Sequence, residues 1–290
     1  MKTDQTTFER REWRSPGGAA GVQLLTEHFD LRVTSPDEEL QQYLPDFMEA
    51  TYAAYTELKP PPEATGRLVT YLFADRPQWA AFTQAAFPQR AQIYLHIHSG
   101  GYTDPDTAVS VVHDIQRDRT LALLAHEGWH QYLATFGQHW TPPWLNEGMA
   151  CQFESFELRG RRPVFTPRKN FLRRNSLRAA TGNGGGLIEL PTLLAINAGD
   201  ALRNAGISTQ SYYAQVWSLV LFLREGENKR YADGLDRLLA DLATDAIPSV
   251  VTAAAATGQS PGEAVFRHYI SDDINAISEQ YSRFVRSLLH

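Results

Sequence analysis

The sequence predicts an α+β protein in which a mixed β-sheet packed on helices is followed by a mainly α-helical part. Short runs of β-branched and aromatic residues occur before residue 114, and segments with helical spacing separate them. Beyond residue 137 most apolar residues recur at helical spacing. The chain has 290 residues and 43% of them are hydrophobic, so one large domain or two closely packed lobes can bury a substantial core.

Residues 1–21 are largely polar and contain Ser15-Pro16-Gly17-Gly18, which predicts a flexible arm. Residues 22–290 are expected to form a single domain, with a sheet lobe over 22–136 and a helical lobe over 137–290. The predicted strands of the sheet lobe are residues 28–34, 67–73, 91–98 and 108–113. Helices are predicted between them over residues 36–58, with Ser35 as N-cap, and over residues 75–87.

A further helix is expected over residues 119–136, and Gly137 ends it. Pro142 and Pro143 then introduce a second helix, because proline is favoured in the first helical turn. The later helices are predicted over residues 191–205, 211–224, 231–244 and 261–289, after a flexible break at residues 182–186. No internal repeat is present.

Composition excludes several classes of protein. The net charge of −6 and the pI near 5.9 argue against a general nucleic-acid binder, which would be basic. The single cysteine, Cys151, cannot form an intramolecular disulfide. No run of about 18 apolar residues is present, so no membrane span is expected. Residues 1–10 lack the apolar core of a signal peptide, so a cytoplasmic protein is expected unless a leader was removed.

The sequence His126-Glu127-Gly128-Trp129-His130 lies within the predicted helix 119–136. Residues four apart share one face of a helix, so the two imidazoles can bind one metal ion. The carboxylate of Glu127 lies beside them, where it can act as a base toward a water activated by the metal. This pattern predicts a hydrolytic zinc site.

The predicted third ligand is Glu147, at the start of the second helix. A set of two histidines and one glutamate leaves the fourth tetrahedral position of zinc open, which is typical of catalytic rather than structural sites. His139 is the rival ligand. The donors suit several divalent ions, so zinc is preferred but other metals stay possible.

These motifs carry a resemblance to a known family. H-E-G-W-H followed by Trp144-Leu145-Asn146-Glu147-Gly148 resembles the gluzincin group of zinc metallopeptidases, in which the second motif supplies the third ligand. The segment beginning at Tyr213 resembles the gluzincin helix whose tyrosine stabilises the oxyanion of the tetrahedral intermediate. The resemblance implies this role for Tyr213, with Tyr212 as its substitute, and a zincin-like fold.

A narrower resemblance covers residues 24–225. The segments Glu27-His28-Phe29-Asp30-Leu31, Tyr71-Leu72-Phe73-Ala74-Asp75-Arg76 and Gly100-Gly101-Tyr102 are similar to peptidase-MA-like bacterial proteins of the DUF1570 type. Two features depart from the gluzincin pattern. The G-x-M-E-N segment that binds a free amino end in the aminopeptidase branch is absent, and Cys151 replaces an aspartate found in some members, with Glu154 as a possible replacement.

The sequence therefore predicts a zinc metallopeptidase with one Zn²⁺ per chain and a peptide or protein substrate. His126, His130 and Glu147 would bind the metal, Glu127 would be the general base and Tyr213 the oxyanion donor. Two alternatives remain: a zinc-dependent amidase or cell-wall peptide hydrolase, and a non-catalytic zinc-binding scaffold. The arm over residues 1–21 could cover the site and regulate it. The oligomeric state is not predicted.

Four other features have weaker interpretations. Residues 108–113 are either an edge strand that pairs with an extended substrate or an ordinary strand, with Gly100-Gly101-Tyr102 as the turn before it. His96, His98 and His113 are expected on the sheet surface. The basic segment 159–178 is either a solvated surface or a site for substrate carboxylates. Cys151 is expected to be buried.

Overall fold

The computed structural model describes residues 6–62, 66–97, 100–137, 140–182, 185–203, 207–256 and 258–290. The chain forms two compact units. The first consists of Met1–Gln138 with Phe156–Phe165, and the second of His139–Ser155 with Thr166–His290. Among the described residues no single helix is long and apolar enough to cross a membrane, and only a bent pair of helices, Ala232–Asp241 with Ala246–Ala255, passes that test together.

The first unit contains a mixed six-stranded sheet in the order β1-β2-β3-β4-β6-β5. Its strands are β1 (Glu9–Arg14), β2 (Ala20–Leu25), β3 (Phe29–Val33), β4 (Leu68–Phe73), β5 (Gly101–Thr103) and β6 (Ser110–His113). The pairs β3–β4 and β4–β6 are parallel, and the other pairs are antiparallel. The α+β class and the mixed sheet expected from the sequence are confirmed.

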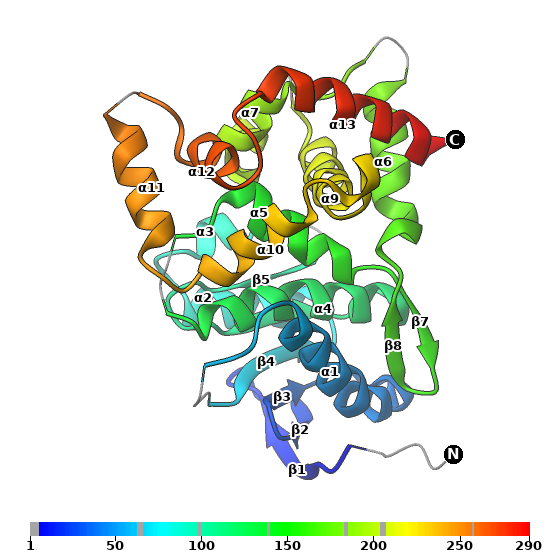
Figure 1. Cartoon of the computed structure of the whole chain (residues 1–290). Coiled ribbons are helices and arrows are strands. Elements are labelled where there is room, and N and C mark those ends of the chain that lie inside the picture. Colours follow the sequence, from blue (N-terminus) through cyan, green and yellow to red (C-terminus); the bar gives the residue numbers. More distant parts are fainter. Residues whose placement is uncertain are drawn as a thin grey trace. The chain divides into compact units, whose positions relative to one another are not determined.

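Helices cover both faces of this sheet. They are α1 (Glu38–Leu58), α2 (Arg76–Ala86), α3 (Ala91–Tyr94) and α4 (Arg117–Ala134). On one face the Thr70 hydroxyl of β4 donates to Gln131 Oε1 of α4 at 2.9 Å. On the other face Trp79 Nε1 of α2 donates to the Val111 carbonyl of β6 at 3.0 Å. The hairpin β7 (Phe156–Arg159) and β8 (Arg162–Phe165) contacts α1 (Figure 1).

Within the predicted arm over residues 1–21, β1 and the start of β2 form a hairpin. Six residue pairs, from Glu9 with Leu25 to Arg14 with Ala20, join the two strands. Gly18 has φ +85° in the turn between them, a conformation that glycine adopts without strain. The side chains of β1 are almost all exposed, so its sequence lacks the apolar alternation that identifies a half-buried strand.

Three local predictions also need correction. Residues 91–98 were expected as a strand, but Ala91–Tyr94 is a helix. Ala91 and Tyr94, three apart, are buried, whereas the Ile93 side chain is 70% exposed, so the apparent alternation reflects helical burial. Gly101 and Tyr102 belong to strand β5 rather than to a turn. β5 forms the edge of the sheet, and β6 is internal. Asp37, not Ser35, caps α1.

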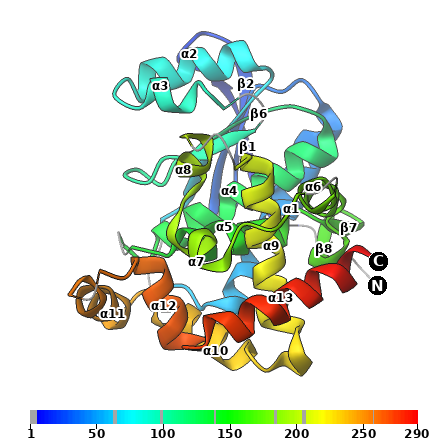
Figure 2. The same cartoon turned by 90° about the horizontal axis from the view of Figure 1, so that it is seen from above.

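The second unit is helical apart from short turns, as the sequence indicates. Its α-helices are α5 (Pro143–Ala150), α6 (Phe171–Thr181), α7 (Leu190–Ala195), α8 (Ala198–Arg203), α9 (Thr209–Glu225), α10 (Ala232–Asp241), α11 (Ala246–Ala255), α12 (Pro261–Tyr269) and α13 (Ile274–Leu289). Three 3₁₀ turns are η1 (Cys151–Phe153), η2 (Pro167–Lys169) and η3 (Glu227–Lys229). The buried helix α9 contacts α5, α6, α8, α10 and α13 (Figure 2).

Two predicted helices of this unit are each divided into two. Residues 191–205 give α7 and α8, and residues 261–289 give α12 and α13. Asp273 explains the second division, because its side chain accepts a hydrogen bond from the Ala276 backbone and so starts a new helix. Helices α6 and α11 were not predicted. In α6 only Leu177 is buried, which leaves almost no apolar stripe in the sequence.

Candidate metal centre

The two histidines of the H-E-x-x-H motif lie one helical turn apart on α4. Their Nε2 atoms are 3.3 Å apart, and the ring planes make an angle of 76°. Two nitrogen ligands of a tetrahedral zinc, each about 2.0–2.1 Å from the ion, are separated by about 3.3 Å. The spacing between His126 and His130 therefore fits two ligands of one ion.

Glu127 is buried and its carboxylate is held from the edge of the sheet. The hydroxyl of Thr103, in β5, lies 2.9 Å from Glu127 Oε2 and 3.0 Å from the Glu127 backbone carbonyl. Only 7% of the Glu127 side chain and backbone is exposed to solvent. The Glu127 carboxylate is thus buried and hydrogen-bonded, on the same helix as the two histidines.

Gly128 allows α1 to approach α4 closely. The hydroxyl of Tyr55 in α1 donates to the Ala125 carbonyl, and a Cβ on Gly128 would lie 2.7 Å from that hydroxyl oxygen. Burial raises the pKa of Tyr55 well above its usual value, and the Glu127 carboxylate adds to this effect. Tyr55 therefore stays protonated and acts as a donor. Nothing in the sequence around Tyr55 indicates this contact.

We expect Gly128→Ala to reduce the free energy of unfolding by about 1–3 kcal/mol, because the new methyl group displaces the Tyr55 hydroxyl from its buried acceptor. Urea denaturation of purified protein measures the effect. Gly66→Ala is the matched control, since a Cβ there meets no atom within 4 Å. Tyr55→Phe removes the hydroxyl that a Cβ on Gly128 would meet. The loss of stability in the variant that combines both substitutions should therefore be smaller than the sum of the two single losses. Wild-type stability of Gly128→Ala would contradict the proposed close contact.

Glu147 lies on α5, which packs closely against α9. A Cβ on the next residue, Gly148, would lie 2.7 Å from the Val216 carbonyl oxygen of α9. Pro143 starts α5 at its first turn. Burial raises the pKa of Tyr212 on α9, and the Glu147 carboxylate contributes to the shift. Close packing of the two helices thus fixes the position of Glu147 within this unit.

His126 and His130 of the first unit and Glu147 of the second make up a group that could hold a metal ion. The donor set is two imidazoles and one carboxylate, which fits zinc with an open coordination position. A second group of the same kind consists of His126, Cys151 and Glu154.

The interactions of Glu154 favour the first group. Arg173 Nε donates to Glu154 Oε2 at 2.7 Å and Arg173 Nη2 donates to Oε1 at 2.5 Å. Asn170 Nδ2 donates to Oε2 at 2.8 Å. A carboxylate that accepts three hydrogen bonds, two of them from a guanidinium, already has its charge compensated. Binding a metal through Glu154 would therefore cost these hydrogen bonds.

Tyr213 lies on α9, and its ring faces the same guanidinium. The Cζ atom of Arg173 lies 4.8 Å from the centre of the Tyr213 ring, a distance that allows a cation–π interaction. Tyr212, its neighbour, is fully buried and its hydroxyl donates to the Ile196 carbonyl at 3.4 Å. The partly buried Tyr213 is thus the more accessible of the two candidates for an oxyanion donor.

The remaining candidate residues of the sequence have other surroundings. His113 is buried rather than on the sheet surface, and its ring packs edge-on against Trp79 at 5.8 Å. His96 is exposed and its Nδ1 contacts the Gln92 carbonyl. His98 and the rival ligand His139 lie outside the described residues. Cys151 is fully buried, as expected.

Arginines of the basic segment have roles in the fold. Arg174 Nη2 donates to the Leu288 carbonyl at 2.8 Å, and Arg178 Nη2 donates to the Leu289 carbonyl at 3.1 Å. These carbonyls belong to the last turn of α13, where no backbone donor is available within the helix. Positive charge at a helix C-terminus is also favourable. Both arginines therefore stabilise the end of α13.

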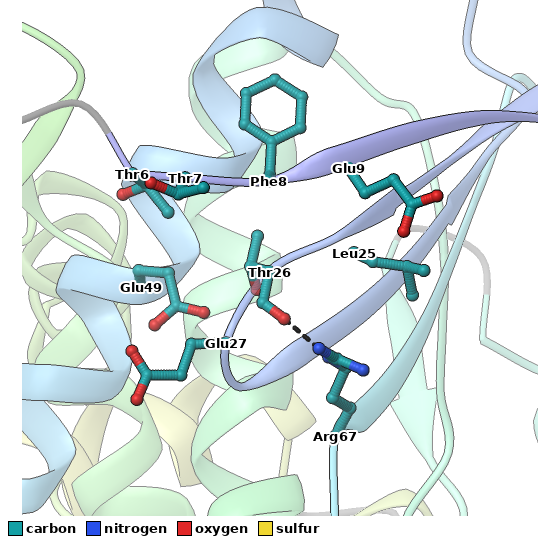
Figure 3. Close-up of a pocket in the computed structure, with 9 residues that line it drawn as sticks. All are labelled: Thr6, Thr7, Phe8, Glu9, Leu25, Thr26, Glu27, Glu49 and Arg67. Atoms are coloured by element: carbon teal, nitrogen blue, oxygen red, sulfur yellow. Dashed lines mark hydrogen bonds between the residues drawn. The ribbon is translucent and has the colours of Figure 1, made fainter.

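A pocket in the first unit lies elsewhere and contains none of the candidate metal ligands. Its lining includes the carboxylates of Glu9, Glu27 and Glu49 and the guanidinium of Arg67, which donates to the Thr26 carbonyl at 2.6 Å (Figure 3). Acidic side chains at an open surface are common, and this pocket does not contribute to the metal centre.

Residues 120–242 match the model of a family described as Protein of unknown function (DUF1570). The matched segment contains His126, Glu127, His130, Glu147 and Tyr213. The match supports the resemblance of this part of the chain to that family. No curated protein and no solved structure matches the chain.

Proposed function

We propose that this protein is a zinc-dependent metallopeptidase of zincin-like fold. The observation that carries the proposal is the pair of imidazoles with Nε2 atoms 3.3 Å apart, next to a buried glutamate on the same helix. His126, His130 and Glu147 would hold the ion, and their donor types fit zinc. Zinc bound there would polarise the peptide carbonyl and lower the pKa of the attacking water.

The chain's own residues would carry the proton transfers. Glu127 takes a proton from the attacking water and delivers it to the leaving nitrogen, so a single carboxylate serves as base and then as acid. Its burial supports this role, because a proton exchanged in a site with little water is retained for the second step. Tyr213 donates a hydrogen bond to the oxyanion, and loss of such a donor typically costs about 10²–10³-fold in turnover.

Metal removal tests the proposal. We expect purified protein to contain one zinc per chain, to hydrolyse members of a fluorogenic peptide library, and to lose this activity after dialysis against a chelator. One equivalent of zinc should restore the activity. Cross-linked muropeptides, assayed in parallel, test the alternative of a cell-wall peptide hydrolase. Peptide hydrolysis that persists in metal-free protein would refute the proposal, and a zinc-loaded protein with no hydrolytic activity would indicate a scaffold.

A further inference from the structure

Thr103, in strand β5 of the sheet, contacts the Glu127 carboxylate through its side chain. Its hydroxyl oxygen lies 2.9 Å from Oε2 and 3.0 Å from the backbone carbonyl of the same glutamate. A hydroxyl has one proton, so it donates to one of the two acceptors at a time. The contact with Oε2 is the shorter of the two.

Thr103 is itself held firmly by its neighbours in the chain. Tyr102 before it is buried, donates to Thr83 Oγ1 at 3.0 Å and stacks on Tyr94 at 3.7 Å between ring centres. Asp104 after it is 2% exposed and accepts hydrogen bonds from the backbone and the hydroxyl of Thr107. Alternate side chains of a strand point to opposite faces, so anchoring Tyr102 in the core directs Thr103 toward α4.

The pairing of β5 with β6 fixes the same residue from a second direction. Thr103 is opposite Ser110, and Gly101 is opposite Val112. A Cβ on Gly101 would lie 2.7 Å from the Val111 carbonyl oxygen, so the strand approaches β6 closely at this point. A three-residue edge strand with both flanks anchored gives a rigid support for one hydrogen bond.

We propose that Thr103 is a positioning residue that fixes the rotamer of Glu127 through Oε2 and leaves Oε1 as the oxygen that transfers the proton. The inference rests on the function proposed above. A buried carboxyl group without this partner would lose a hydrogen bond and could adopt other rotamers. Small displacements of a catalytic group can cost up to about 10²-fold in rate.

Three substitutions test the proposal. Thr103→Val replaces the hydroxyl with a methyl group of similar shape, and Thr103→Ser retains the hydroxyl. Ser110→Ala is the matched control, because it removes a buried hydroxyl from the paired residue on β6 without affecting Glu127. We expect Thr103→Val to lower kcat about 10–100-fold with KM and zinc content unchanged, and both Thr103→Ser and Ser110→Ala to stay within about two-fold of wild type.

A crystal structure of Thr103→Val provides a readout that does not depend on activity. We expect the Glu127 side chain to occupy more than one rotamer there and a single rotamer in Thr103→Ser. If Thr103→Val does not fold, Thr103→Ala gives the same comparison without a branched side chain. Wild-type kcat in the folded valine or alanine variant, or a serine variant as impaired as either, would overturn the proposal. If the wild-type protein hydrolyses no peptide, the proposed function fails, and the rotamer of Glu127 still decides the role of Thr103.

Discussion

Glu127→Gln is expected to lower kcat for peptide hydrolysis by about 10²–10⁴-fold while one zinc per chain is retained. Glutamine has nearly the same shape as glutamate, and its side-chain oxygen can still accept the hydrogen bond from Thr103. The amide cannot take a proton from water, so only the proton transfers are lost. His126 and His130 are unchanged, and their Nε2 atoms, 3.3 Å apart, can still bind the ion.

Metal analysis and steady-state kinetics on the same preparation separate the two properties. Glu49→Gln is the matched control, because it neutralises a largely buried glutamate of the same unit that contacts His28 instead of the candidate centre. We expect the control to keep both zinc and activity. Undiminished hydrolysis in Glu127→Gln would exclude Glu127 as the base. Loss of zinc together with activity would mean that the glutamate contributes to metal binding.

The sequence predicts those parts of the site that depend on the periodicity of one helix. His126, Glu127 and His130 need only the 3.6-residue repeat to have the observed relation. The contacts that support them come from distant segments. Thr103 reaches Glu127 across 24 residues of sequence and Tyr55 reaches Ala125 across 70. Threonine and tyrosine occur throughout the chain, and composition does not indicate which of them meets the metal helix.

The fold shows the same division between local and distant information. The mixed sheet was predictable because β3, β4 and β6 are largely buried runs that contain apolar, β-branched or aromatic residues. The edge strands β1 and β5 were missed. The side chains of β1 are almost all exposed, and β5 has only three residues. Both strands depend on pairing with a neighbouring strand. Helix α3 was misread as a strand, because four residues contain too few positions to separate the two periodicities.

Glu147→Gln and Glu154→Gln are expected to have opposite effects, and their comparison identifies the third metal ligand. We expect Glu147→Gln to weaken zinc binding by more than about 100-fold, which exceeds the effect typical of a lost outer-shell partner. An amide is neutral and a weaker donor than a carboxylate. The stability of the metal-free protein should change little, because the replacement keeps the volume of the side chain. Competition with a chromophoric chelator measures the affinity.

Glu154→Gln is expected to retain zinc and to lose stability. The carboxylate of Glu154 and the guanidinium of Arg173 form an ion pair in which the two side chains are only 10% and 13% exposed. Removing one partner of a buried pair leaves the other charge uncompensated, which typically costs about 3–5 kcal/mol. Denaturation of the metal-free protein in urea measures this loss. Arg173→Met should be destabilising for the same reason. The variant that combines Glu154→Gln with Arg173→Met should lose less stability than the sum of the two single losses.

The reverse result would assign the ion to the other group. If Glu154→Gln loses zinc and Glu147→Gln retains it, the ligands are His126, Cys151 and Glu154. Cys151→Ser then distinguishes the two ligand groups, because replacing a thiolate ligand with a hydroxyl causes a large loss of zinc affinity. With His126, His130 and Glu147 as ligands, Cys151→Ser leaves zinc binding unchanged. Because Glu154 already accepts three hydrogen bonds from Arg173 and Asn170, releasing it to bind a metal would leave a buried guanidinium without its counter-charge.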